Sequence, residues 1–471
     1  MTRAFRLSAL LVAAALAGCA TVDIDQQLAT TNQEAAAFTG GQLALARTDE
    51  QRAQQQAAAD RLLAAPLGQP QAVQLALAGS PAVQAAIAQR WAEAATAAQS
   101  ARLANPMFSF ERMRGGPELE LTRTLSFGLF ELLTLPARAA QAERRIAASQ
   151  VQLTASAVDQ VTQVRQTWVR AVAAQQSLGY ARQVQASAEV SAELARRMQA
   201  VGNWNRLTRA RQQLFYADAT TQLALAEQQA ASSRAALVRL LGLDAAQAAR
   251  LQLPDRLPDL PKAPLAAQAL NQTALDTRLD VRLARARYNQ SAHARGLGRV
   301  TSLIDVELDL KRKSVWPDAN ADRESGRGWE LGVRLPIFDF GDVQRDAMSA
   351  QTLAAANQLL AVRRTAGAQL QDSYATYRTA WDVAHHYQSE VIPLRQLMQE
   401  ENLLRYNGML IGVFELLQDA REQVQSVIAA IGAQQQFWQA DAALQASLIG
   451  QPTGTLLSAS TNTGAGDAAA H

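Results

Sequence analysis

The chain has 471 residues, of which 48% are hydrophobic but only 5% aromatic. This length exceeds what one compact core usually holds, and the alanine-rich composition favours long, closely packed helices over a bulky core. The net charge of +3 gives no reason to expect a nucleic acid partner, and a single cysteine excludes an internal disulfide and a cysteine-based metal cluster.

Residues 1–18 have the layout of a secretory signal peptide. A basic start with Arg3 and Arg6 precedes an apolar run from Leu7 to Ala17, which is too short to span a bilayer because spanning takes about 20 residues. The run ends in Leu16-Ala17-Gly18-Cys19, which resembles the bacterial lipobox, whose cysteine becomes the acylated first residue. We therefore expect Cys19 to be lipidated; an ordinary signal peptide with an incidental cysteine is the alternative.

Residues 19–70 are rich in glutamine, alanine and threonine, and we expect an extended or partly helical lead-in. A helical pattern begins at Gln71 and breaks at Ser80-Pro81, where proline suits a first helical position. The pattern restarts and stops at Asn105-Pro106, so two successive helices are predicted.

A period of two then replaces the helical pattern over about residues 107–127 and predicts a β-hairpin with a turn at Gly115-Gly116-Pro117. Its apolar face holds Phe108, Phe110, Leu119, Leu121, Leu125 and Phe127, and its polar face holds Glu118, Glu120, Thr122, Thr124 and Ser126. Arg123 falls on the apolar face, so either its side chain reaches a polar boundary or the register slips there.

A very long helix is predicted next. From Pro136 to Ala200 there is no further proline, and apolar residues keep the spacing of a packed helix. At 1.5 Å per residue this helix would be about 95 Å long. The sequence Val201-Gly202-Asn203 predicts its end in a tip at about residues 201–206, and a return helix runs to Leu241-Gly242. A proline-rich linker over residues 251–264 separates two halves of the chain.

The second alternating region, at about residues 302–336, carries the clearest strand signal. Its apolar positions are Ile304, Val306, Leu308, Leu310, Trp329, Leu331, Val333 and Leu335, and its charged positions are Asp305, Glu307, Asp309, Glu330 and Arg334. A polar run from Trp316 to Gly328 lies between the two parts, so we predict a hairpin with a long loop.

The same order of elements occurs twice, over residues 71–250 and 265–450. Equivalent residues lie 208 positions apart: Phe130 and Phe338, Arg197 and Arg405, Gly242 and Gly450. This indicates an internal duplication, with the second tip at about residues 406–414. Residues 451–471 are rich in small polar residues, and we expect a disordered tail.

Two hairpins with one apolar and one charged face suit a membrane barrel, but four strands cannot close one, and an open edge is not tolerated in lipid. We therefore expect a mainly α-helical fold with a small β part, in which several copies share one transmembrane β-barrel. The polar face would line its lumen, with Glu111 and with the candidate residues Glu118, Glu120, Asp305, Glu307, Asp309 and Glu330. These carboxylates outnumber the nearby bases and would favour cations.

Residues 70–450 resemble the TolC-type outer-membrane factors, the channels of tripartite efflux pumps and type I secretion. The most similar segments are Arg278-Leu-Asp-Val-Arg282, residues 332–341 (GVRLPIFDFG), and Arg405-Tyr406 leading into Phe414-Glu415-Leu416-Leu417. Leu279 stands where the family usually has proline. The resemblance implies a homotrimer with a shared twelve-stranded barrel and a coiled-coil helical tunnel in the periplasm. It also implies a periplasmic adaptor protein and an inner-membrane pump as partners.

The resemblance implies roles for both tips. Adaptor contacts would fall on Val201, Gly202, Asn203, Asn407, Gly408 and Gly412. Tyr406 and Glu415 match positions that constrict the periplasmic end of the family's channels; the next acidic position falls on Gln418, with Asp419 one residue later. Gly408 stands one place early, and Thr208 replaces an acidic gate residue of some members. An ordinary acidic residue in the first turn of a helix explains Glu415 equally well.

Other polar residues do not indicate an enzyme. His385 and His386 are adjacent on a predicted helix and point about 100° apart, which is poor geometry for joint chelation. No nucleophile motif, phosphate loop or zinc spacing occurs in the sequence, so no cofactor or metal site is expected. The function predicted from the sequence is a lipid-anchored exit duct in the outer membrane. A coiled-coil lipoprotein that tethers without forming a channel is the alternative.

Overall fold

The computed structural model describes residues 22–266, 275–301, 305–317, 322–334, 338 and 340–450, so Cys19 and the tail after residue 450 lie outside the described residues. The chain divides into two compact units. One takes residues 1–161, 235–253 and 273–367, and the other takes residues 162–234, 254–272 and 368–471. Each unit therefore draws on both predicted repeats, and the boundary between the units does not follow the predicted boundary between the repeats.

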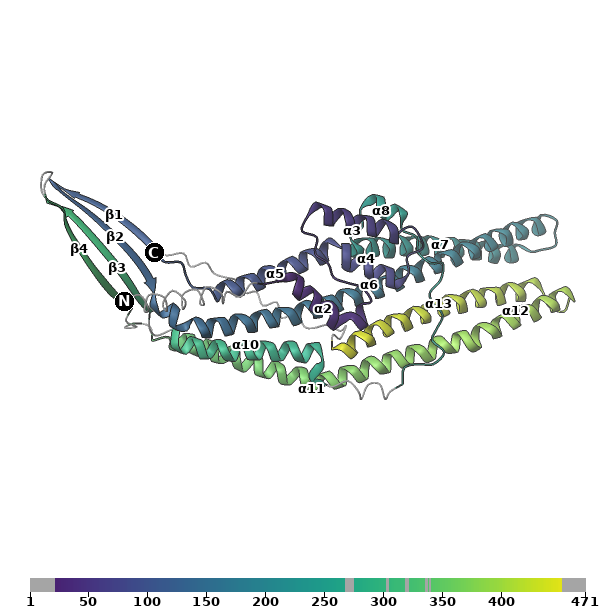
Figure 1. The fold of residues 1–471 in the computed structure, drawn as a ribbon. Coiled ribbons are helices and arrows are strands. Elements are labelled where there is room, and N and C mark those ends of the chain that lie inside the picture. The colour runs from purple at the N-terminus through teal and green to yellow at the C-terminus, as the bar shows by residue number, and fades with distance from the viewer. Residues whose placement is uncertain are drawn as a thin grey trace. The chain divides into compact units, whose positions relative to one another are not determined.

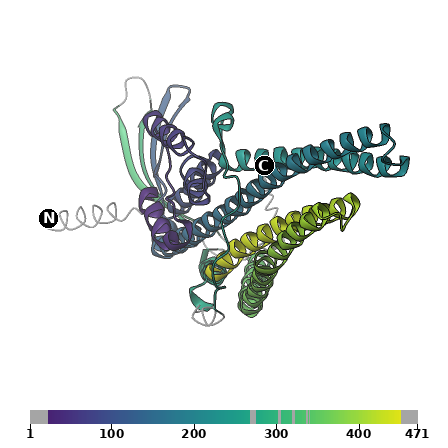
Figure 2. The ribbon, with the colours of Figure 1, turned by 90° about the vertical axis from the view of Figure 1, so that its right-hand side faces the viewer.

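Helices make up most of both units (Figure 1 and Figure 2). The longer ones are α2 (Ile24–Thr39), α3 (Asp49–Leu62), α4 (Gln69–Gly79), α5 (Pro81–Ser100), α6 (Leu129–Ala200), α7 (Arg206–Leu241), α10 (Leu279–Thr301), α11 (Asp342–His386), α12 (Ile392–Asn407) and α13 (Val413–Ile449). The short ones are α8 (Ala245–Arg250), the 3-10 turn η1 (Leu275–Thr277) and the π turn η2 (Tyr387–Val391).

The long helix α6 begins at Leu129, earlier than the predicted start at Pro136, so this proline lies inside the helix. Proline removes one backbone donor and crowds the preceding turn. Side chains occupy neighbouring carbonyls: the Thr134 hydroxyl donates to Phe130, and Arg138 Nη2 donates to Glu131 at 2.9 Å. These bonds add contacts within the first turns of α6, and the helix continues through the proline to Ala200.

The lead-in is more helical than predicted, because α2 and α3 both precede residue 69. Asp23 caps the start of α2, and Ile24 and Leu28 are buried. Two polar contacts hold α2 to later helices: Gln150 Nε2 donates to the Thr31 hydroxyl at 2.8 Å, and Arg282 Nη2 lies 3.0 Å from Glu34 Oε1. Long-range partners thus order a segment whose sequence alone is ambiguous.

The start of α5 and the end of α7 meet at Gly242. The Ser80 hydroxyl donates to the Leu240 carbonyl at 3.2 Å. Gly242 has a φ of +73°, and a Cβ atom at this position would lie 2.3 Å from Pro81 Cδ. Glycine is therefore required here both by its backbone conformation and by the close approach of Pro81.

The other unit has an aromatic core between α11 and α13. Its buried members are Leu370, Tyr377, Trp381, Ala384, Ala433, Phe437, Ala440 and Leu444. The proline-rich linker is hydrogen-bonded to these helices: Trp438 Nε1 donates to the Pro258 carbonyl at 3.0 Å, and Trp381 Nε1 donates to the Pro261 carbonyl at 3.2 Å. Prolines leave the linker carbonyls without competing backbone donors nearby, and tryptophan side chains satisfy them.

The four strands form one antiparallel sheet in the order β1-β2-β3-β4. Their bounds are β1 (Met107–Gly115), β2 (Glu118–Gly128), β3 (Asp305–Trp316) and β4 (Glu324–Arg334). The sequence analysis left open whether the strand register slips at Arg123. In the structure the register is continuous, and Arg123 lies opposite Phe110 in β1 and Arg312 in β3. The register therefore does not slip at Arg123.

The second hairpin has longer strands and a shorter loop than predicted. β3 extends to Trp316 and β4 begins at Glu324, so much of the predicted loop from Trp316 to Gly328 is strand. Pairing explains the difference: Lys313 and Ser314 lie opposite Thr122 and Leu121 of β2, which extends the ladder toward the turn. Glycine and serine lower strand propensity, but this ladder overrides that preference.

Candidate functional site

The polar face of the sheet collects the predicted lumen carboxylates. Because paired residues share a face, the register places Glu118, Glu120, Glu307, Asp309 and Glu330 on one side. Glu111 of β1 and Glu324 of β4 join them. The side chain of Asp305 lies outside the described residues, although its backbone pairs with Arg334. The sheet therefore brings charged groups from all four strands together.

Two lysines that the sequence prediction overlooked also lie on this face. Lys313 Nζ is 2.7 Å from Glu120 Oε1, and Lys311 pairs with Glu330. The Ser126 hydroxyl donates to Asp309. The signal for the lysines was present, since Lys311 and Lys313 continue the spacing of two that begins with Glu307 and Asp309. Acidic groups still outnumber basic ones on this face.

The opposite face is apolar and exposed in the single chain. Near the helices its rows hold Val306, Val333, Leu308, Leu331, Phe127, Phe108, Leu125, Leu310 and Trp329. Trp329 is 72% exposed and Phe108 is 64% exposed. Such a large uncovered apolar surface indicates contact with lipid or with another protein.

The edges of the sheet, β1 and β4, have no partner strand within the described residues. In an antiparallel sheet of four strands, the two edge strands run in opposite directions. The β4 edge of one copy can therefore pair antiparallel with the β1 edge of another, and a closed ring of copies leaves no free edge.

The first predicted tip forms a tight turn between α6 and α7. Gly202 has a φ of +80°, and the Asn203 backbone N–H donates to the Met198 carbonyl at 2.9 Å. Val201 is 70% exposed. The glycine conformation ends the helix and presents an apolar side chain at the turn.

The second tip ends differently because its glycine stands one place early. Gly408 keeps a negative φ of −78°, and Met409 adopts the left-handed conformation with a φ of +56°. Met409 is 93% exposed and Leu410 is also exposed. Both tips therefore end in exposed apolar side chains. Val201 was among the predicted tip residues, whereas Met409 and Leu410 were not.

The candidate gate residues have unequal environments. Tyr406 is 37% exposed, Glu415 is exposed in the first turn of α13, and Asp419 is buried with 7% exposure. Asp419 Oδ2 has no hydrogen-bond partner among the described atoms. Glu415 is thus available to a neighbouring copy, whereas Asp419 faces the interior of its own chain.

A contact between α13 and α7 lies beside Asp419. The Arg421 guanidinium stacks 4.3 Å from the centroid of the Phe215 ring, and Arg421 Nη2 donates to the Arg211 carbonyl at 3.3 Å. At the next residue, Glu422, Arg395 donates to the carboxylate at 2.9 Å and holds its pKa below the usual value. Sequence reasoning missed this cluster because its members lie on separate helices.

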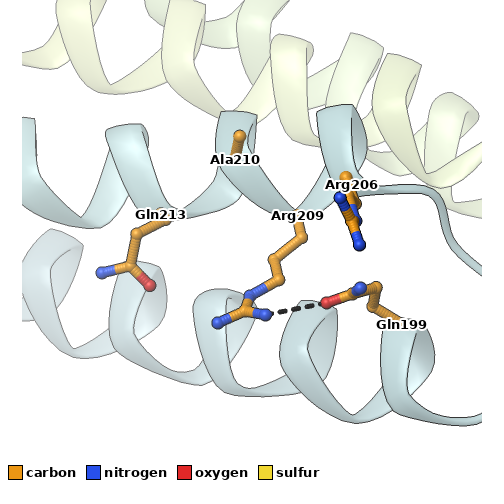
Figure 3. Close-up of a pocket in the computed structure, with 5 residues that line it drawn as sticks. All are labelled: Gln199, Arg206, Arg209, Ala210 and Gln213. Atoms are coloured by element: carbon orange, nitrogen blue, oxygen red, sulfur yellow. Dashed lines mark hydrogen bonds between the residues drawn. The ribbon is translucent and has the colours of Figure 1, made fainter.

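A shallow pocket of about 500 Å³ lies beside the first tip, lined by Gln199, Arg206, Arg209, Ala210 and Gln213. Figure 3 shows Arg209 reaching from one helix to Gln199 on the other, where Arg209 Nη1 donates to Oε1 at 2.8 Å. The pocket is open to solvent, which suits contact with a protein surface better than enclosure of a small molecule.

The two adjacent histidines have separate neighbours. The His385 ring stacks on Trp381 with a centroid distance of 4.6 Å, and His386 Nδ1 lies 3.2 Å from Glu390. Among the described residues, no group of three or more His, Cys, Asp or Glu side chains is arranged to hold a metal ion. The same part of the chain contains no helix that is long and apolar enough to cross a membrane.

Comparison with known proteins shows the fold. No family model and no curated protein sequence matches the chain. Among solved structures, the Campylobacter jejuni CmeC outer membrane channel is 13% identical with a TM-score of 0.68, and covers 89% of this chain and 92% of its own. CusC, whose structures concern folding and transmembrane channel formation, is 16% identical with a TM-score of 0.65. The match covers 83% of this chain and 92% of CusC. The Vibrio cholerae outer membrane protein VceC is 16% identical with a TM-score of 0.64, and the match covers 84% of this chain and 96% of VceC.

These matches confirm the predicted fold class, a mainly helical chain with a small four-stranded antiparallel sheet. The resemblance to outer-membrane factors is confirmed at the level of the fold. The roles of the lumen, tip and gate residues stay predictions.

Proposed function

We propose that this chain is one subunit of an outer-membrane channel that passes substrates from a periplasmic adaptor and an inner-membrane pump to the exterior. The four-stranded sheet carries the proposal: it has one exposed apolar face, one charged face and two edges that no other strand of the described residues pairs with. No single copy can hold such a sheet in lipid, because the edge backbone groups would lack partners. A closed ring of copies satisfies them, with the apolar face toward lipid and the charged face toward water.

Three copies are proposed because the chain shares its fold with outer-membrane channels and resembles a trimeric family. Uncovered apolar side chains on the helices support association: Val190, Leu194, Leu207, Leu214, Leu353, Leu360, Leu394 and Leu397 are all exposed in the single chain. Association would bury this surface as a coiled coil does. The proposed adaptor contact uses the exposed apolar residues of the two tips, and Cys19 would add a lipid anchor.

Disulfide cross-linking tests the closed ring. Within one sheet, Ser109 of β1 and Gly328 of β4 lie in the same row, linked through Thr124 and Lys311. Three strand spacings, about 14 Å, separate them, which exceeds the roughly 7 Å that a disulfide allows between Cα atoms. Ser109→Cys combined with cysteine at Gly326, Gly328 or Gly332, in a Cys19→Ser background, should therefore cross-link only between copies.

The expected product is a ladder of bands that stops at three chains for at least one pairing. Each single-cysteine variant is the matched control and should stop at two chains. Monomer alone in every pairing would contradict the shared barrel and favour the tether alternative.

Ion preference is a second expected result. Reconstituted protein should conduct in planar bilayers and favour cations, because carboxylates outnumber amines on the polar face. Neutralising Asp305, Glu307 and Asp309 together should shift the reversal potential in a salt gradient toward zero. The double variant Glu120→Gln/Lys313→Gln is the control, since it removes an ion pair without changing net charge. An unchanged reversal potential in the triple variant would remove these residues from the lumen.

The periplasmic end should be closed in part by Glu415. Three copies of this exposed carboxylate converging on an axis would attract divalent cations. Glu415→Gln should therefore raise the conductance of the resting channel and weaken block by divalent cations added from the tip side. Glu400→Gln makes the same charge change on exposed α12 and should alter neither. If Glu415→Gln only lowers thermal stability slightly, by about 0.3–1 kcal/mol, the residue is a first-turn helix acid.

A further inference from the structure

Arginines gather on the apolar face of the sheet, in the half that lies toward the turns. By register and alternation, Arg112 and Arg114 of β1, Arg123 of β2, Arg312 of β3 and Arg327 of β4 share this face. Arg323, just before β4, joins them: its Nη2 donates to the Ser314 hydroxyl at 2.9 Å, and its guanidinium lies 5.6 Å from the centroid of the Trp316 ring. We call these six residues the arginine belt.

The belt contains like charges directly opposite one another. Arg123 pairs in register with Arg312, and Arg312 pairs with Arg327, so three arginines form one row across three neighbouring strands. Like charges at directly opposite positions of a sheet repel and destabilise it. An external anion that binds across the row would remove this repulsion.

The sheet itself supplies no such anion on this face. All acidic residues within the described parts of the four strands lie on the polar face, and no carboxylate of the described residues forms an ion pair with the belt. The polar face is arranged differently, because Lys311 and Lys313 each pair with a glutamate there. The lysines are therefore neutralised within the chain, whereas the belt is left for a ligand.

The position of the belt indicates what that ligand is. By register, rows of apolar residues from Val306 to Leu310 lie between the belt and the strand ends that adjoin the helices, and the β1–β2 turn at Gly116 lies on the other side of the belt. An outward face that changes from apolar to basic along the strand matches the change from acyl chains to headgroups. Trp316 within the belt fits this boundary, where aromatic side chains collect.

The inference rests on the proposed function, which places the helices in the periplasm. In that orientation the opposite end of the sheet reaches the outer leaflet. We propose that the arginine belt binds the phosphate groups of the phosphorylated glycolipid, lipopolysaccharide, in that leaflet. Guanidinium groups bind phosphate oxygens in pairs of hydrogen bonds, so arginine is better suited than lysine to this task. The row of Arg123, Arg312 and Arg327 would hold one phosphate between neighbouring strands.

For the test, purified protein is reconstituted into phosphatidylethanolamine vesicles that contain lipopolysaccharide. The amount of lipopolysaccharide that the protein retains is then measured. The wild-type protein should retain lipopolysaccharide, and at least ten times less of its dephosphorylated form. The variant Arg112→Gln/Arg312→Gln/Arg327→Gln should also retain at least ten times less than wild type. Lys311→Gln/Lys313→Gln changes the lumen face instead and should retain the wild-type amount. Equal retention of the phosphorylated and dephosphorylated forms by wild type would overturn the proposal without relying on any variant.

A second measurement separates this proposal from the channel function. In bilayers of phosphatidylethanolamine alone, the arginine variant should form channels of wild-type conductance, because its changes lie outside the lumen. Wild-type retention by a variant that conducts normally would refute the belt while leaving the channel intact. Absence of conductance from the wild type would count against the channel itself, whatever lipid is retained.

Discussion

Replacing Asp280 by alanine should destabilise the fold by about 3–5 kcal/mol, because it leaves a buried cation without its partner. The Arg278 side chain is 0% exposed, and its Nη2 atom lies 2.8 Å from Asp280 Oδ2. Its Nε atom donates to Oδ1 at 3.2 Å. A guanidinium cannot lose its proton in a protein, so the charge stays when the carboxylate is removed. The measurement is the midpoint of thermal unfolding, followed by circular dichroism.

Asp276 supplies a matched control on the same stretch. Its carboxylate lies 2.6 Å from Arg285, but both side chains are about half exposed. Asp276→Ala should cost less than about 1 kcal/mol, since water replaces the lost interaction. The double variant Arg278→Met/Asp280→Asn should cost much less than Asp280→Ala, because no buried charge is then left without a partner. Equal losses of stability for Asp280→Ala and Asp276→Ala would show that the buried pair contributes no more to stability than the exposed pair.

The Arg278–Asp280 pair lies in the segment from Arg278 to Arg282. Asp280 accepts from the Val281 backbone N–H at 2.8 Å, and Arg282 reaches Glu34 of α2. The segment Arg278 to Arg282 therefore anchors the start of α10 within the fold.

The strands could be predicted well because alternation reveals the face of each residue directly. Glu307, Asp309 and Glu330 were assigned to one face from their spacing, and the register places them there. The length of β3 and β4 was not predictable in the same way, since serine and glycine near Ser325 and Gly326 are typical of loops. Their strand conformation depends on pairing with β3 and, through it, with β2.

The helical tips show the limit of sequence reasoning more sharply. The turn at Gly202 was predicted because glycine suits a left-handed residue, and it has a φ of +80°. At the second tip the left-handed residue is Met409, which a propensity argument rejects. Burial of Asp419 was not predicted either; two residues later, Arg421 contacts α7, a helix that is distant in sequence.

The strongest expected pH effect comes from Asp441 on α13. Burial raises the pKa of this carboxyl to about 6, although Arg165 and a hydrogen bond from Gln445 oppose the rise. Gln445 Nε2 donates to Asp441 Oδ2 at 2.6 Å, and Arg165 Nη1 donates to Gln445 Oε1 at 2.9 Å. Burial raises the pKa of Tyr377, and the negative charge of Asp441 adds to that rise. The carboxylate is thus held in a cluster that lacks enough solvent to stabilise its charge.

The sign of the effect follows from linkage. In the unfolded chain the carboxyl has a pKa of about 3.9, so between that value and about 6 the folded state binds more protons than the unfolded state. Stability therefore falls as pH rises through this window. The contribution of Asp441 should be about 2 kcal/mol less favourable at pH 7 than at pH 4, from the difference between the two pKa values.

Asp441→Asn should remove this dependence. Other carboxylates titrate in the same range, so the quantity to measure is the difference between wild type and variant in unfolding midpoint at pH 4, 5, 6 and 7. The unfolding midpoint of the variant should rise steadily relative to that of the wild type as pH rises, and this relative rise should level off above about pH 6.5. Asp382→Asn, at an exposed ion pair with Arg378, is the control and should show no such rise. A constant difference between wild type and Asp441→Asn across the range would mean that this carboxylate keeps its charge in the fold, stabilised by Arg165 and Gln445.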